Sequence, residues 1–600
     1  MFLGQIFRGK GILMAVADIP VTSEHRWEDI AENDRFIAQI EQYRRGELDP
    51  DVFKPTRLKH GVYGIRGSDT HMIRVKLPGG RVTAQQFAKL GDIAEKYASG
   101  MGHVTTRQDI QYHYVTIEDV PRVLRELESV GITTREACGN SVRNVTACPL
   151  AGICSKEAFD IGPHTLGLAR HLLRNPKSQD LPRKFKISVS GCDTDCAMAA
   201  IHDIGLVGRK RIVNGQEQHG FRLLAAGGLG SWPRPAMPIA EFVRVEDLPV
   251  WAEAIVEVFA QFGNRKDRNK ARMKFVLAEK GFDWFQNEIL TRVAARGINV
   301  EEALSFHAEL PSNHNGNGNG HKKALVQIAP VGADQEGKSD RWLQTNVWPQ
   351  KQEDLAAVWV KLESGAITTA QFYQLADLSL KYGDGTVRTS ATQNMLLPNV
   401  AVANLKALHE GLVAAGLDAQ GVHDIADVVS CPGAETCNLG ITKSRNLAEV
   451  LRDRVQAITD EGSRKIRIKI SGCPNSCGQH HVADIGFHGM SRKVDGDQAP
   501  YYQLLIGGNG AHNSPGFAKK LIPIHARRIP EAVDRIVNFY ERERLVGETF
   551  AAFAQRQGIE GFRPVVDHLT KLDPSDVTLR YDWGEDTGFK LNVGQGECAS

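Results

Sequence analysis

The sequence lacks both a long apolar segment and an excess of charge of one sign. No apolar run reaches the roughly 18–20 residues that a membrane-spanning helix needs, and the apolar stretch 11–17 is short for a signal peptide. The 73 Lys and Arg residues are nearly balanced by 71 Asp and Glu residues, so the overall charge does not indicate a nucleic-acid or membrane partner. We expect a cytoplasmic protein of several domains, because 600 residues exceed the usual size of one core.

The sequence also lacks a nucleotide-binding fingerprint. The segments GGLG at Gly227 and GGNG at Gly507 do not complete a G-x-G-x-x-G motif between a strand and a helix. No flavin or nicotinamide domain is evident. If the chain is a redox enzyme, its electrons must therefore come from a separate protein.

Eight of the ten cysteines form two copies of one pattern, C-x5-C followed by C-x3-C. The copies are Cys148, Cys154, Cys192 and Cys196, and then Cys431, Cys437, Cys473 and Cys477. Cys138 and Cys598 are left over. In a long chain without a convincing secretion signal, patterned cysteines are metal ligands more often than disulfides.

Other segments repeat in the same order as the cysteines. VKLPGGRVTAQQF at Val75 pairs with VKLESGAITTAQF at Val360, and SGCDTDCAMAAIHDIGLVG at Ser190 pairs with SGCPNSCGQHHVADIGFHG at Ser471. The chain therefore consists of two homologous halves. The segment 311–337 between them begins near NHNGNGNGHKK, a composition typical of a flexible linker.

Each half alternates predicted strands and helices, which indicates a mixed α/β architecture. The predicted order is strand 72–77, helix 84–99, strand 109–115 and helix 120–130, repeated as 358–362, 369–382, 395–400 and 402–415. The segments KFKISVSGC and RIKISGC read as further strands that end at a Gly-Cys turn.

Four thiolates at these spacings can hold a [4Fe–4S] cluster. The spacings are loose for tetrahedral zinc, which prefers C-x2-C pairs. For the second set, zinc and buried structural thiols remain as alternatives to the cluster. For the first set, the alternatives are a cluster, another metal or a structural relic.

CPGAETC followed by SGCPNSCG resembles the signature of the siroheme-dependent sulfite and nitrite reductases, and the likeness extends from about residue 60 to about residue 538. The resemblance implies an internally duplicated α+β fold with ferredoxin-like half-domains and siroheme- and cluster-binding domains. It also implies siroheme and a [4Fe–4S] cluster as cofactors. The cluster ligands would be Cys431, Cys437, Cys473 and Cys477, and Cys477 would bridge the cluster to the siroheme iron.

The resulting domain prediction has seven parts. These are an N-terminal extension (1–55), a ferredoxin-like half-domain (56–135), a siroheme/[4Fe–4S]-type domain (136–310), a linker (311–340), the second half-domain (341–420), the second siroheme/[4Fe–4S] domain (421–545) and a C-terminal tail (546–600).

The resemblance also assigns basic residues to the site. Arg74, Arg143, Lys184 and Lys186 match the positions that contact the substrate anion, and Arg107, Gln111 and Arg272 match positions that contact siroheme carboxylates. Lys184 and Lys186 are two apart on a predicted strand, so they share one face. Hydrogen bonds from such groups polarise departing oxygen atoms while ordered water relays protons.

Comparison of the two halves indicates one complete site. Arg74, Arg107 and Arg143 align with Trp359, Thr392 and Ala426, whereas Lys184 and Lys186 align with the basic residues Lys465 and Arg467. A site between the halves would therefore join the second-half cysteines to the first-half basic residues. We expect one catalytic siroheme, with a second candidate cluster at the first cysteine set.

The resemblance implies six-electron reduction of sulfite to sulfide, with ferredoxin or a flavoprotein reductase as electron donor. Reduction of nitrite to ammonia at the same site is the first alternative. The second alternative is an iron–sulfur electron-transfer protein without a catalytic heme, and a zinc-stabilised binding module is the third.

Overall fold

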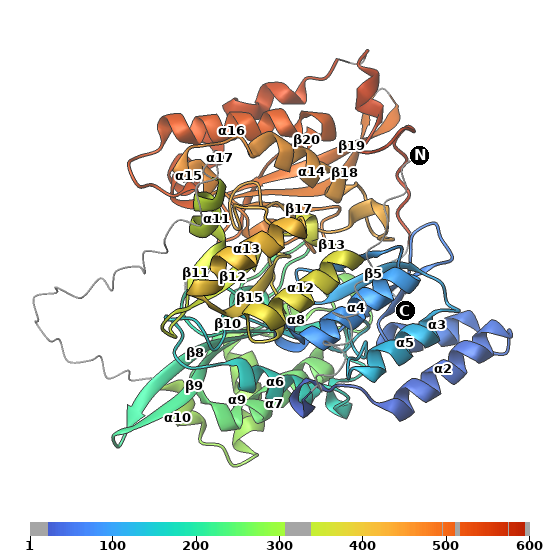
Figure 1. Cartoon of the computed structure of the whole chain (residues 1–600), viewed down its shortest axis with the longest axis vertical. Helices are drawn as coiled ribbons and strands as arrows, with labels where there is room; N and C mark the ends of the chain where they lie inside the picture. Colours follow the sequence, from blue (N-terminus) through green and yellow to red (C-terminus); the bar gives the residue numbers. More distant parts are fainter. Residues whose placement is uncertain (1–21, 306–337, 495, 511–515, 574, 595–600) are drawn as a thin grey trace, which may run out of the picture.

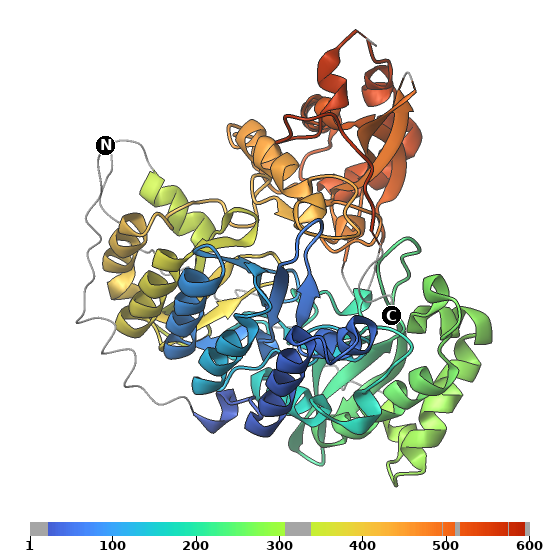
Figure 2. The same ribbon diagram turned by 90° about the vertical axis from the view of Figure 1, so that its right-hand side faces the viewer.

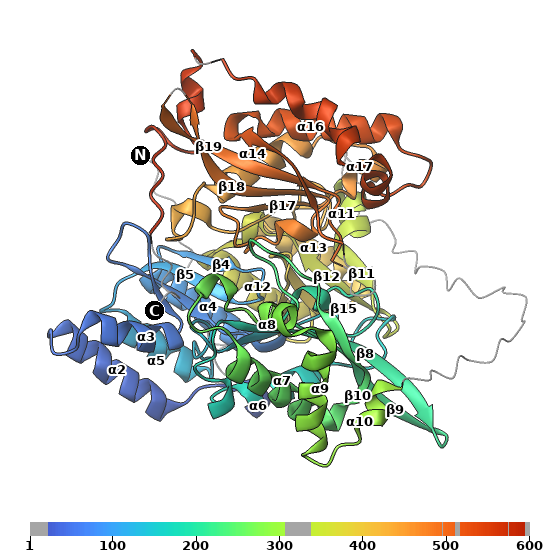
Figure 3. The same ribbon diagram turned by 180° about the vertical axis from the view of Figure 1, so that it is seen from behind.

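A computed structural model of the chain describes residues 22–305, 338–494, 496–510, 516–573 and 575–594. The predicted linker segment 311–337, the stretch 11–17 and Cys598 lie outside these ranges. In Figure 1 the second cysteine-bearing domain lies at the top and the first at the bottom, with the two ferredoxin-like half-domains between them. Figure 3 shows the same order from behind. No helix in the described ranges combines the length and apolar character needed to cross a membrane.

The two half-domains exchange a strand. The first sheet has the order β1 (Val62–Gly64), β2 (His71–Val75), β5 (Ile110–Val115), β4 (Met101–Val104) and β13 (Ala366–Thr368). The second has the order β11 (Val347–Pro349), β12 (Leu355–Val360), β15 (Met395–Ala401), β14 (Thr386–Thr389) and β3 (Arg81–Thr83). Each sheet is thus completed by an antiparallel strand from the other half, and the buried apolar residues of both half-domains form one core.

The repeated LPGG and LESG segments explain this exchange locally. Gly80 and Gly365 have φ values of 68° and 74°. A Cβ at Gly80 would lie 2.6 Å from the carbonyl oxygen of Thr389, and a Cβ at Gly365 would lie 2.3 Å from that of Val104. Only glycine combines the left-handed conformation with so close an approach. The strand that follows each turn can then pair with the opposite half.

The two cysteine-bearing domains share a second topology. The first sheet has the order β10 (Met237–Arg244), β9 (Gln216–Ala225), β8 (Ile204–Val213), β7 (Phe185–Ser190) and β6 (Val142–Ala147). The other has the order β16 (Val429–Ser430), β17 (Ile468–Ser471), β18 (Ile485–Val494), β19 (Asp497–Ile506) and β20 (Lys519–His525). In both sheets the three strands nearest the cysteines are parallel.

The helices also follow the duplication. The first half-domain has α2 (Ile30–Arg44), α3 (Pro50–Lys59), α4 (Ala84–Tyr97) and α5 (Val120–Ser129), and the second has α11 (Lys338–Asn346), α12 (Thr369–Tyr382) and α13 (Leu405–Ala414). The first cysteine domain has α6 (Gly162–Leu172), α7 (Leu248–Phe262), α8 (Met273–Lys280), α9 (Phe282–Ala294) and α10 (Val300–Leu304). The second has α14 (Ser444–Val455), α15 (Glu461–Arg464), α16 (Ile529–Glu543) and α17 (Phe550–Val566).

Helices α4 and α12 begin with the same capping box. Thr83 and Thr368 accept hydrogen bonds from the backbone N–H groups of Gln86 and Gln371, whose side chains bond back to the capping residues. This arrangement satisfies backbone donors at both helix starts. The structure thus confirms both predicted helices, and α12 has the predicted bounds. The short strands β3, β4, β13 and β14 were not predicted.

Candidate active site

The second cysteine set lies at the carboxyl ends of two parallel strands. Cys431 follows β16, whereas Cys473 and Cys477 follow β17. Residues 429–430 pair with residues 469–470 in parallel register, which brings the two loops to one edge of the sheet. Cys437 lies at the other end of the loop that begins at Cys431. The four thiols thus come from two loops on a rigid frame.

All four thiols of this set are close enough to interact electrostatically with one another. Burial, and then the neighbouring Cys477, raise the pKa of Cys437 to about 11, and burial likewise raises the pKa values of Cys431 and Cys473. The backbone N–H of Gly472 donates to Cys431 Sγ at 3.2 Å. Thiols that resist ionisation, yet accept hydrogen bonds at sulfur, fit thiolate ligands whose charge iron neutralises.

Among the described residues, no group of three or more His, Cys, Asp or Glu side chains is arranged to hold a metal ion.

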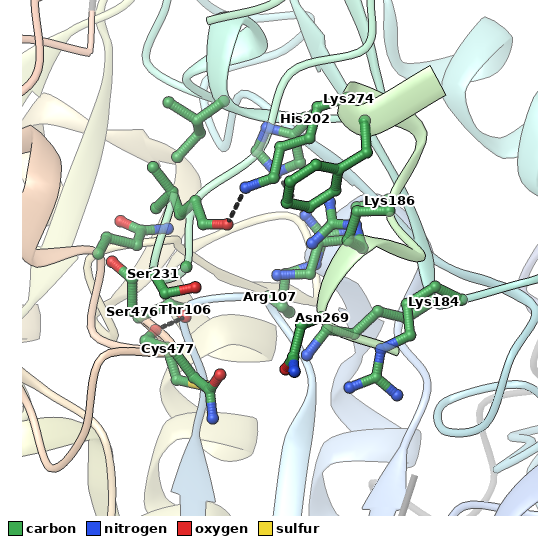
Figure 4. A pocket seen from close by; sticks show the side chains of 18 of the residues that line it. Thr106, Arg107, Lys184, Lys186, His202, Ser231, Asn269, Lys274, Ser476 and Cys477 are labelled. Atoms are coloured by element: carbon green, nitrogen blue, oxygen red, sulfur yellow. Dashed lines mark hydrogen bonds between the residues drawn. The ribbon is translucent and has the colours of Figure 1, made fainter. Parts of the chain in front are cut away.

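A polar cavity opens beside Cys477, between the two cysteine domains. Figure 2 shows the loops of these domains meeting next to the first half-domain. In Figure 4, Ser476 and Cys477 lie on one side of the cavity, and Lys184, Lys186 and Lys274 lie on the other. Its lining includes Thr106, Arg107, Lys184, Lys186, His202, Arg272, Lys274, Asn475, Ser476, Cys477 and Gln479.

The basic residues of the cavity repel one another. Burial, and then the positive charges of Arg107, Lys184 and Arg272, hold the pKa of Lys186 well below its usual range. Burial lowers the pKa of Arg107 to about 10, and burial followed by Arg272 lowers that of Lys274 to about 7. Such a cavity gains stability when an anion enters.

Asp203 orients two of these basic residues. Its carboxylate oxygen Oδ2 accepts hydrogen bonds from Arg272 Nη2 at 2.8 Å and from the backbone N–H of Lys186 at 2.9 Å. Arg107 is held separately by His202 Nε2 at 2.6 Å and by the hydroxyl of Thr146 at 3.2 Å. The guanidinium groups are therefore fixed before any ligand arrives.

The cavity fits the carboxylates of siroheme. The Nε atoms of Arg107 and Arg272 are buried without a hydrogen-bond partner in the described structure. A buried donor without a partner costs free energy until an acceptor reaches it. Siroheme carries eight carboxylates, which are acceptors of the required charge and geometry. The donor set and the four thiols are thus both suited to the cofactors that the sequence pattern implies.

Three of the predicted site residues lie behind the cavity wall. Arg74 and Arg143 both donate to the carbonyl oxygen of Ala137, at 3.2 and 2.9 Å. Gln111 accepts from Arg74 Nε at 3.0 Å when its amide is turned so that the oxygen faces the guanidinium. Arg74 and Arg143 lie close enough to Arg107 to lower its pKa, although none of the three residues lines the cavity. In this structure they support the basic cluster from behind.

Contacts between the halves align the two sides of the site. The hydroxyl of Thr106 donates to the carbonyl oxygen of Cys477 at 2.8 Å. Arg66 Nη1 donates to the carbonyl oxygen of Gly440 at 2.7 Å, and Asn438 Nδ2 donates to that of Gly64 at 3.2 Å. The first half-domain thereby holds the loops that carry Cys437 and Cys477.

The counterparts of the basic residues in the other half have different surroundings. Trp359, the counterpart of Arg74, is buried against Trp348 and His423, with ring centroids 5.5 and 4.9 Å apart. The counterparts of Lys184 and Lys186, Lys465 and Arg467, are exposed. The first cysteine set nevertheless lies at equivalent positions, at the ends of β6 and β7.

Several residues of the site were not predicted from the sequence. Thr106, His202 and Lys274 line the cavity, and Asp203 contacts the lining residues Arg272 and Lys186. A signal for Asp203 is present in the repeat, because HDIG at His202 pairs with ADIG at Ala483. Asp484, the counterpart of Asp203, accepts from the backbone N–H of Arg467 at 2.9 Å. Both halves thus use the same aspartate to fix the strand that carries the basic pair.

The substitution Asp203→Asn tests this anchoring. Asp203 is fully buried and the Arg272 side chain is 13% exposed, so loss of the charge is expected to lower the free energy of unfolding by about 3 kcal/mol. The matched control is Asp484→Asn, whose partner Arg467 is 46% exposed and for which we expect a loss below about 1 kcal/mol. Urea titrations measure the free energy of unfolding of both variants. Equal losses of this free energy would show that Asp203 does not anchor Arg272.

Comparisons with known proteins agree with this geometry. The model of the "Nitrite and sulphite reductase 4Fe-4S domain" matches residues 138–296 and 421–572, and that of the "Nitrite/Sulfite reductase ferredoxin-like half domain" matches residues 65–130 and 348–415. The assimilatory ferredoxin-dependent nitrite reductase of Haloferax mediterranei is 31% identical over 84% of this chain and 85% of its own length. Sulfite reductase [ferredoxin] 1 of Mycolicibacterium paratuberculosis is 30% identical over 82% of this chain and 83% of its own length.

A solved structure, that of the Mycobacterium tuberculosis NirA protein, shares the fold. It superposes with a TM-score of 0.74 and 26% identity, over 90% of this chain and all of that chain. The predicted duplicated α+β fold is thus confirmed, as is an enzyme that uses siroheme and a [4Fe–4S] cluster. The chain belongs to the nitrite and sulfite reductase family.

Proposed function

We propose that the chain reduces sulfite to sulfide by six electrons, at a siroheme joined through Cys477 to a [4Fe–4S] cluster. The observation that carries this proposal is the cavity in which Lys184 and Lys186 of the first half face Cys477 of the second. An electron-transfer protein without a heme has no need of a buried anion cavity. The cavity therefore favours catalysis over the electron-carrier alternative.

Each group in the proposed site has a distinct task. Cys431, Cys437, Cys473 and Cys477 would hold the cluster, while Arg107 and Arg272 would bind siroheme carboxylates. When bound, siroheme supplies the iron at which the anion is held and reduced. Lys184 and Lys186 would bind the anion's oxygen atoms, and Arg74 and Arg143 would add positive charge from behind. We keep Gln111 as a residue that orients Arg74.

The reduction consumes protons, and Lys274 in the cavity is suited to deliver them because burial lowers its pKa to about 7. Lys186, whose pKa burial holds well below its usual range, is placed to bind the anion's oxygen atoms. An acid whose pKa lies near the working pH donates a proton more readily than an ordinary lysine. The same groups stabilise negative charge on a departing oxygen atom because they are fixed in advance.

Nitrite is the second candidate substrate. The ferredoxin–nitrite reductase of Spinacia oleracea is 31% identical over 75% of this chain and 72% of its own length, a likeness equal to that of the sulfite reductases. We propose a ferredoxin as electron donor, because the nitrite and sulfite relatives alike are named for it.

Side-by-side steady-state assays test the proposed substrate. Purified enzyme of known siroheme content, with reduced methyl viologen as donor, is expected to show a higher kcat/KM for sulfite than for nitrite. A higher kcat/KM for nitrite would instead assign the site to that anion. If an enzyme that contains siroheme reduces neither anion, the proposed function is wrong.

A further inference from the structure

The first cysteine set occupies the same structural positions as the second. Cys148 follows β6, and Cys192 and Cys196 follow β7. The strands β6 and β7 are parallel, with Ala147 opposite Val189, as β16 and β17 are in the second half. The carboxyl ends of parallel strands therefore deliver two loops of thiols to one edge of each sheet. All four cysteines of the first set are free of disulfides in this structure.

The hydrogen bonds to sulfur are also duplicated. In each set, the first three cysteines accept a hydrogen bond from the backbone of the residue two positions later. The donors are Leu150, Lys156 and Thr194 in the first set and Gly433, Leu439 and Asn475 in the second. Hydrogen bonds to the ligand sulfur atoms tune the potential of an iron–sulfur cluster. The first half therefore has both the four cysteines and the backbone hydrogen bonds to their sulfur atoms.

The loop between Cys148 and Cys154 is held from outside by the other half. Arg388 Nη1 donates to the carbonyl oxygens of Pro149 at 2.7 Å and Ala151 at 2.8 Å. Gln352 Nε2 donates to the carbonyl oxygen of Gly152 at 2.9 Å, and the backbone N–H of Lys351 donates to that of Ile153 at 2.9 Å. The loop is therefore fixed by the opposite half, as Arg66 and Asn438 fix the loop of Cys437. A preorganised loop loses less entropy when its thiols bind a cluster.

The thiols of the first set lie close together. Cys148 is hydrogen-bonded to Cys196, and Cys154 to Cys192. Cys154 and Cys192 also interact electrostatically with Cys196. Cys148 is buried, Cys154 and Cys192 are half-buried, and Cys196 is exposed. The site is thus reachable from the surface on one side and closed by the core on the other.

We propose that Cys148, Cys154, Cys192 and Cys196 bind a second [4Fe–4S] cluster, which has no siroheme of its own. The second part follows from the counterparts of the cavity residues, because Lys465 and Arg467, which correspond to Lys184 and Lys186, are exposed. The counterpart of Arg107 is Thr392, so this anchor for siroheme carboxylates is missing from the other half. This cluster is therefore a one-electron centre that is not bridged to a heme.

The first test is a count of iron, acid-labile sulfide and siroheme in the isolated enzyme. Two clusters and one siroheme require about eight non-heme irons and about eight sulfides per siroheme. About four of each would overturn the second cluster and leave the proposed function intact. A protein that carries iron and sulfide but no siroheme would instead overturn the proposed function, so the two failures are distinguishable.

The variant Cys154→Ser/Cys192→Ser locates the additional irons. It is expected to lose about four irons while its siroheme absorption stays unchanged, and its reduced form should lose an electron paramagnetic resonance signal that is not coupled to the heme. The matched variant Cys437→Ser/Cys473→Ser should lose the other four irons. If the variant proves insoluble, the count of iron and acid-labile sulfide per siroheme in the wild-type enzyme still tests for the second cluster. Two disulfides among the first four cysteines, found by thiol titration of the denatured wild type, would also contradict the proposal.

Discussion

Replacement of Cys477 by serine is expected to reduce the rate of sulfite or nitrite reduction by far more than the roughly 10- to 100-fold that loss of an outer-shell partner of a metal site costs. Cys477 lines the cavity from the second half and lies close enough to the buried Lys186 to affect its pKa. In the proposed site its sulfur joins the cluster to siroheme. Serine has the same shape but lacks the sulfur, so the electronic coupling between the two cofactors should be lost.

The measurement is the siroheme absorption spectrum together with methyl viologen-dependent turnover. The matched control is Cys196→Ser, the equivalent position of the first half. Cys196 does not line the cavity, so this control should keep its siroheme spectrum and its heme coupling. Full turnover by Cys477→Ser, or loss of siroheme from Cys196→Ser, would contradict the assignment.

Replacement of Lys186 by methionine is expected to lower kcat/KM for the anion by about a hundredfold, the loss typical of one preorganised donor. Methionine keeps much of the side chain's volume but removes its charge. Because burial and neighbouring positive charges already hold the pKa of Lys186 well below its usual range, the variant should be as stable as the wild type without cofactor, or more stable. A loss of rate without a loss of stability separates an anion-binding role from a structural one.

Lys184→Met and Lys465→Met provide the matched comparison between the halves. Lys184 lines the cavity, whereas its counterpart Lys465 is exposed on the surface. We expect a rate loss of about tenfold or more for the first and an unchanged rate for the second. Siroheme content is measured in each variant. Equal rates for Lys184→Met, Lys186→Met and the wild type would remove both lysines from the site.

Local sequence signals predict the elements that carry the cysteines. The alternation of apolar and β-branched residues before SGC gives β7 and β17, and the repeated Thr-x-x-Gln gives the capped starts of α4 and α12. These features depend on residues only a few positions apart, so they can be read from a single sequence. The duplication places both cysteine sets on equivalent frames.

The strand exchange depends on contacts that no local signal reports. β3 and β13 have three residues each and pair with strands of the opposite half. Their sequences, RVT and AIT, are too short for a period-2 pattern to be diagnostic. The positive φ values of Gly80 and Gly365 indicate the strand exchange only when the contact of each glycine with the other half is known.

Motif matching does not give the hydrogen-bond partners of Arg74 and Arg143. Both guanidinium groups turn to the loop 137–139, where Arg143 donates to the carbonyl oxygens of Ala137 and Gly139. Motif position gives the identity of a residue but does not give its rotamer or its hydrogen-bond partners. Asp203 was missed although the repeated Asp-Ile-Gly marks it, because the repeat does not show which residues contact the carboxylate.

A structure of the enzyme with its cofactors bound, determined by crystallography, tests the central claim most directly. The account predicts one siroheme in the cavity, with its carboxylates on Arg107 and Arg272 and its iron joined to the cluster through Cys477 Sγ. It also predicts that Lys184 and Lys186 contact the bound anion. A siroheme located beside Cys196, or one that makes no contact with the basic residues of the first half, would contradict the claim that one site is built from both halves.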